Sequence, residues 1–103
     1  MSTAKNPLAV RVAKLKELAA DTRERMAAEL FEVGRVEQTM SEVAGQGFTT
    51  LTITPTRALD LRNTAAAREL VAQLSAAGAR CEWEPRRTNG PENVTAYALV
   101  ITW

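Results

Sequence analysis

Histidine is absent from this chain of 103 residues, and cysteine occurs once, as Cys81. Without histidine the chain lacks the commonest general base, the usual metal ligand and the Ser-His and Cys-His nucleophile pairs. A zinc site needs several Cys or His ligands, so one cysteine on an alternating strand is expected to be a core residue. Glu82 and Glu84 could share one face of a strand as paired carboxylates, but a solvated strand face is the simpler interpretation. We therefore expect no enzymatic activity, no metal and no cofactor.

The chain also lacks charge of one sign, because 13 Lys and Arg residues oppose 12 Asp and Glu residues and leave a net charge of +1. No global field then attracts it to nucleic acid or to anionic lipid. A lone cysteine cannot form an internal disulfide and suits a reducing compartment, which predicts a cytoplasmic protein. The chain has no signal-like segment and no apolar run of a length that spans a membrane.

Hydrophobic residues make up 46% of the chain and charged residues 24%, the balance of a globular protein, so we expect one α+β domain over residues 1–103. Residues 6–45 consist mostly of strong helix formers and predict a long amphipathic helix. Its apolar positions recur at spacings near three and four: Leu8, Val12, Leu15, Leu18, Met26, Leu30, Val33, Met40 and Val43. Asn6 can cap this helix, Pro7 suits its first turn, and Gly45–Gly47 can end it.

We favour one continuous helix, which at about 1.5 Å per residue would reach roughly 55 Å. That length exceeds the radius of so small a domain, so the overhang needs a partner. The alternative is a helical hairpin, because Asp21 followed by Glu24 resembles a capping box that could restart a helix.

Residues 48–103 predict a β-α-β-β unit. Phe48–Thr54 alternates as a strand, a helix follows over about 63–77 with Gly78 at its end, and the strands 80–85 and 94–103 form a hairpin around Asn89-Gly90-Pro91. The last strand is apolar on both faces, as expected of a central strand. We therefore predict a split β-α-β antiparallel sheet in the order 1-3-2. The short helix should cover one face, while Ala96 and Ala98 on the other leave room for the long helix or a second copy.

The leading hypothesis is a non-catalytic protein-protein interaction or assembly module that forms a homodimer through its long helix. The predicted contact patch on that helix consists of Met26, Leu30, Val33, Gly34 and Met40. Gly34 is unfavourable within a helix, so it indicates either the close approach of another backbone or simple tolerance. An inhibitor, an adaptor and a structural subunit all fit this description, and so does a small regulatory protein of a phage that blocks host machinery.

The alternative hypothesis is a small DNA- or RNA-binding regulator. Arg86, Arg87 and Asn89 lie in the predicted hairpin loop, with Trp83 and Tyr97 on the adjoining strands and a basic start to the helix. Acidic residues surround the same arginines, and that arrangement is more typical of a solvated loop or of the rim of a protein-binding surface.

Overall fold

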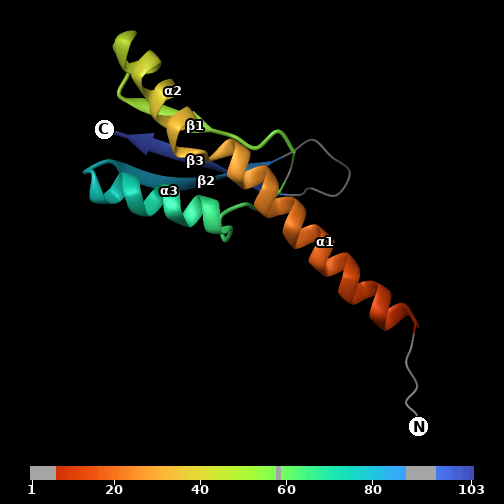
Figure 1. Ribbon diagram of the computed structural model, residues 1–103. Coiled ribbons are helices and arrows are strands. Elements are labelled where there is room, and N and C mark those ends of the chain that lie inside the picture. Colours follow the sequence, from red (N-terminus) through yellow and green to blue (C-terminus); the bar gives the residue numbers. More distant parts are fainter. Residues whose placement is uncertain (1–6, 58, 88–94) are drawn as a thin grey trace.

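The computed structural model describes residues 7–57, 59–87 and 95–103. In this part of the chain three helices and three strands follow one another as α1 (Pro7–Leu30), α2 (Val33–Gly45), β1 (Thr50–Ile53), α3 (Ala65–Ala76), β2 (Arg80–Arg87) and β3 (Thr95–Thr102), as Figure 1 shows. The strands form one antiparallel sheet in the order β1-β3-β2. The α+β class, the split β-α-β arrangement and the strand order 1-3-2 are confirmed.

Strand β3 lies at the centre of the sheet, because it pairs with β1 on one side and with β2 on the other. Leu51 of β1 and Cys81 of β2 both lie opposite Ile101, and Ile53 and Trp83 both lie opposite Leu99. Side chains two residues apart share one face of a strand, so these residues form an apolar row across the sheet. Strand β2 continues past Pro85 to Arg87, where the prediction ended it. An edge strand tolerates proline because the missing N–H can face away from the sheet.

All three helices pack on the face of the sheet that carries this apolar row. The core cluster draws on each helix, on the connection before α3 and on β3: Ala27, Phe31, Val36, Leu61, Ala67, Leu70, Leu99 and Ile101. Helix α2 packs against β1, and α3 packs against β2 and α1. Of the two occupants predicted for the opposite face over Ala96 and Ala98, the long helix is therefore wrong, and the second copy stays a prediction. Both alanines are buried, but neither belongs to the core cluster under the helices.

The long N-terminal segment is two helices, so the predicted continuous helix over 6–45 is wrong. Helix α1 ends at Leu30, and Glu32 has an extended backbone with φ −63° and ψ 125°. The Glu32 carboxylate then caps α2, accepting hydrogen bonds from the backbone N–H groups of Gly34 at 3.1 Å and Arg35 at 3.0 Å. A side-chain acceptor at this position satisfies N–H groups that have no partner within the helix.

The core explains the break between α1 and α2, because one straight helix could not bury both Ala27 and Val36 in the same core. At about 100° per residue, Ala27 and Val36 would point in opposite directions along an uninterrupted helix. Both residues are nevertheless buried, at 0% and 3% exposure. Phe31 lies at the break, 2% exposed, with its ring edge-to-face against Trp83 at a centroid distance of 5.8 Å. The interruption changes the rotational phase of α2 so that its apolar stripe meets the same core.

The predicted restart at Asp21 and Glu24 is also wrong, because α1 runs without interruption through both residues. Glu24 is a cap, but for a different helix. Its carboxylate oxygens accept the backbone N–H of Ala65, the first residue of α3, at 2.9 and 3.1 Å. A carboxylate at a helix N-terminus also interacts favourably with the helix dipole. This contact joins α1 to α3 across 41 residues of sequence.

The molecule is elongated, with principal extents of 66, 31 and 17 Å. Figure 1 shows the cause: α1 contacts the sheet layer only near its C-terminal end, and its N-terminal half points away from the body. Every residue from 7 to 21 is exposed. The overhang expected from the sequence is therefore present, although α1 alone forms it.

Candidate interaction surfaces

The side chains considered for catalysis lie along strand β2. Glu82 and Glu84 are exposed on β2, and Glu84 pairs with Arg86 at 3.4 Å. Cys81 is half-buried, and burial raises the pKa of its thiol above the ordinary 9.0, so it is protonated and weakly nucleophilic at neutral pH. Among the described residues no group of three or more Cys, Asp or Glu side chains is placed to hold a metal ion.

Of the predicted hairpin-loop residues, the structure describes the side chain of Arg86 alone. Arg86 is paired with Glu84, Arg87 is described only as a strand residue opposite Thr95, and Asn89 lies outside the described residues, as does the Asn89-Gly90-Pro91 turn. The Trp83 ring packs edge-to-face against Phe31 in the core. Stacking on nucleic acid bases requires accessible ring faces, so these contacts add no support to the nucleic-acid hypothesis.

Tyr97 makes an intramolecular contact that the sequence did not indicate. The guanidinium of Arg62 lies 3.5 Å from the centre of the Tyr97 ring and forms a two-pronged ion pair with Asp60, at 2.9 and 2.8 Å. These hydrogen bonds from Arg62 lower the pKa of the Asp60 carboxyl below its ordinary value. This cluster of Asp60, Arg62 and Tyr97 fixes the connection before α3, in which Leu61 is buried in the core. Its only sequence signal is the spacing of Asp60 and Arg62, which is too common to single out.

The predicted contact patch on the long helix is divided between the core and the surface. Met40 and Leu30 are partly buried and pack against the core cluster, and Met26 is half-buried. Val33 is 36% exposed. Around Gly34 a Cβ atom would meet Oε1 of Glu32 at 2.9 Å, and the other nearby atoms also belong to Glu32. Within the chain, the glycine therefore leaves space for the Glu32 carboxylate that caps α2.

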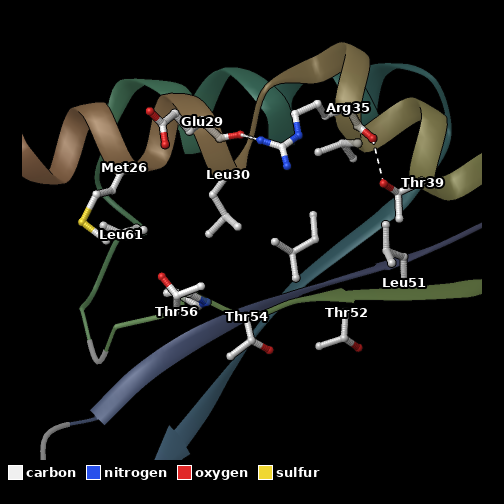
Figure 2. Close-up of a pocket in the computed structure, with 13 residues that line it drawn as sticks. Met26, Glu29, Leu30, Arg35, Thr39, Leu51, Thr52, Thr54, Thr56 and Leu61 are labelled. Atoms are coloured by element: carbon white, nitrogen blue, oxygen red, sulfur yellow. Dashed lines mark hydrogen bonds between the residues drawn. The ribbon is translucent and has the colours of Figure 1, made fainter.

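A groove of about 450 Å³ runs between the α1–α2 junction and the outer edge of β1. Figure 2 shows Leu30, Met26 and Arg35 on the helix side and the threonines of the β1 segment on the sheet side. Arg35 reaches the backbone carbonyl of Glu29 at 3.5 Å, and its own carbonyl accepts a hydrogen bond from the Thr39 hydroxyl at 2.9 Å. We call this the edge groove.

A second groove of about 420 Å³ lies between α2 and α3, and we call it the α2–α3 groove. Its lining is mostly apolar: Val33, Val36, Met40, Ala44, Leu70, Leu74, Ala77 and Trp103, with Glu37, Ser41 and Gln73 as the polar residues. Glu37 is the one charged residue in this lining, and neither ion pair of the described residues involves it. The groove is therefore apolar with an acidic margin.

The N-terminal half of α1 exposes large apolar side chains. The exposed fractions are 46% for Val12, 56% for Leu15 and 58% for Leu18. Val12, Leu15 and Ala19, spaced by three and four residues, form a continuous stripe that we call the α1 seam. An isolated apolar residue on a surface is ordinary, but an aligned group on a projecting helix is typical of an interaction site.

Comparison with models of protein families, with curated proteins and with solved structures gives no match to this chain. In the part of the chain that the structure describes, no helix combines the length and the apolar character needed to cross a membrane.

Proposed function

We propose that this chain is a non-catalytic protein-protein interaction module that forms a homodimer through α1. The exposed α1 seam is the observation that carries the proposal. A 24-residue helix that packs on its own domain over only its C-terminal end gains little tertiary support along the rest of its length. Isolated helices of about 12–15 residues are marginal in water, so a packing partner would stabilise this segment.

The charge on the overhang supports a protein partner more than a nucleic acid. Arg11, Lys14 and Lys16 make it basic, but Glu17 and Asp21 follow within the same segment. A seam of apolar side chains beside these charges suits a helix-binding surface, where apolar contacts supply affinity and charges select the partner. The free thiol of Cys81 suits a reducing compartment such as the cytoplasm. An inhibitor, an adaptor and a structural subunit would each use such a module.

The solution mass tests this proposal. We expect light scattering to give twice the chain mass at low and moderate salt, unchanged by a short duplex or a single-stranded oligonucleotide. Leu15→Glu should yield a monomer, because it places a charge in the seam at a side chain that is already 56% exposed and so leaves the fold intact. Ala13→Glu, which places the same charge on the opposite side of α1, should remain a dimer.

A monomeric wild-type chain would contradict the proposal. A complex with oligonucleotide that weakens steeply with salt would instead support the nucleic-acid alternative, because release of counterions makes such binding strongly dependent on salt.

A further inference from the structure

The residues beside the α1 seam argue against pairing of α1 with a second α1. In a helix pair with Val12 and Ala19 at position a and Leu15 at position d of a heptad, the flanking positions e and g belong to Arg11, Lys16 and Leu18 along the overhang. Toward the body they belong to Arg23 and Arg25. Parallel helices bring g against e of the partner, and antiparallel helices bring like positions together. Either arrangement of two identical helices would place basic residues opposite one another.

The α2–α3 groove has the complementary chemistry. Its lining is apolar apart from three residues, and the one charged side chain among them, Glu37, is acidic. Glu69 lies at the same side of α3, where its carboxylate accepts a hydrogen bond from the groove residue Gln73 at 2.9 Å. The α1 overhang would bury its apolar seam in this groove, and the basic residues beside the seam would face the carboxylates of Glu37 and Glu69. Opposite charges placed across an interface in this way favour the correct partner.

The dimensions agree as well. The overhang over residues 7–21 corresponds to about 22 Å of helix, and α2 and α3, with 13 and 12 residues, correspond to about 20 and 18 Å. The overhang cannot reach the groove of its own chain, because α1 extends from the α1–α2 junction in the direction away from α2, as Figure 1 shows. An α1 overhang can therefore enter the groove only from another copy of the chain.

We propose that the α2–α3 groove of one copy receives the α1 seam of a second copy. Val12 and Leu15 pack against Met40 and Leu74 of the partner, which are only partly buried, and Lys16 and Arg11, on the two sides of the seam, face its Glu37 and Glu69. Both copies carry a seam and a groove, and the proposal is that they exchange them reciprocally about a two-fold axis, which closes the assembly as a dimer. This inference rests on the proposed function and names the surface that completes it.

A charge reversal separates this arrangement from a pair of α1 helices, because only the groove arrangement predicts weaker association and its rescue through Glu37. In the double variant Arg11→Glu, Lys16→Glu we expect weaker association, by about two- to fivefold in the dissociation constant for each exposed charge. Adding Glu37→Lys to the same chain should restore part of the loss. A pair of α1 helices would not be weakened by the double variant, because reversing both members of a like-charged pair leaves a like-charged pair, and it would not respond to Glu37→Lys. Sedimentation equilibrium measures each dissociation constant.

Disulfide trapping locates the contact directly. In a Cys81→Ala background, a chain with Ala19→Cys is mixed under oxidising conditions with a chain that carries Ser41→Cys or Gln73→Cys. All three positions are exposed, so the substitutions leave the fold in place. We expect cross-links between the α1 cysteine and at least one groove cysteine, and none with a control chain that carries Thr52→Cys on the opposite side of the sheet.

Cross-links between two Ala19→Cys chains, or a dimer that forms no cross-link at either groove position, would overturn the inference and leave the homodimer proposal standing. A monomeric wild-type chain would overturn both and leave the groove to a helix from a different protein.

Discussion

Thr64 combines burial with two hydrogen bonds at the start of α3, and among the described residues it is the one buried polar side chain. Its hydroxyl donates to the Leu61 carbonyl at 2.7 Å and accepts from the Ala67 N–H at 3.3 Å. We expect Thr64→Ala to lower the free energy of unfolding by about 1–2 kcal/mol, because it removes the cap and the shorter of two hydrogen bonds to the Leu61 carbonyl, which keeps only the Thr64 backbone N–H at 3.3 Å. Urea unfolding followed by circular dichroism measures the change.

Thr64→Ser is the matched control for this prediction, because it keeps the hydroxyl and removes only a methyl group. It should lie much closer to the wild type than Thr64→Ala does. If the serine variant lost as much stability as the alanine variant, packing of the methyl group and not the cap would explain the effect.

At the scale of the elements, the junction between α1 and α2 depends on one side chain. Glu32 accepts two backbone hydrogen bonds at the start of α2. Glu32→Ala should therefore lower the free energy of unfolding by about 1 kcal/mol, since the Gly34 and Arg35 N–H groups lose their acceptor. The urea midpoint measures this effect.

Glu42→Ala removes the same side chain from an exposed position near the C-terminal end of α2, where it caps nothing, and should leave the midpoint almost unchanged. A midpoint for Glu32→Ala that equals or exceeds that of the wild type would contradict the role of Glu32. It would indicate that α1 and α2 gain more from joining than they lose with the cap.

For the whole molecule, the elongated shape predicts uneven stability along the chain. Backbone amides of β3 lie in the middle of the sheet and should exchange with solvent only on global unfolding. Amides of residues 8–20 should exchange rapidly in dilute protein, because the overhang has little tertiary packing there. At concentrations that favour the dimer, protection of residues 8–20 should rise severalfold. Hydrogen exchange measured by mass spectrometry at two protein concentrations tests this.

The Leu15→Glu variant provides the reference, since it should exchange rapidly over residues 8–20 at both concentrations. Equal and slow exchange of this segment in the wild type at every concentration would mean that the overhang is stable without a partner, and that the dimer is not what orders it.

Local patterns in the sequence were sufficient for the elements after residue 48 and for their order. Alternation identified the strands, and β3, apolar on both faces, had to lie at the centre of the sheet. Gly78 was expected at the end of α3, and its φ of +98° is one that glycine adopts without strain. For the interaction surfaces, apolar spacing showed that the long helical segment has an apolar face, but not which part of that face the chain covers itself.

Only the tertiary structure determined which part of this apolar face is buried and which is exposed, because burial depends on where a helix lies relative to a core built from distant residues. Met40 and Leu30 pack against the core cluster, whereas Val12 and Leu15 are exposed. For the same reason α1 ends at Leu30, because α2 must be rotated relative to α1 so that Phe31 and Val36 both reach the core. Tertiary packing also brings Glu24 to the N-terminus of α3, which it caps from 41 residues away in the sequence. Local sequence determines which residues favour a helix, but long-range packing determines where that helix must break and which of its faces stays open.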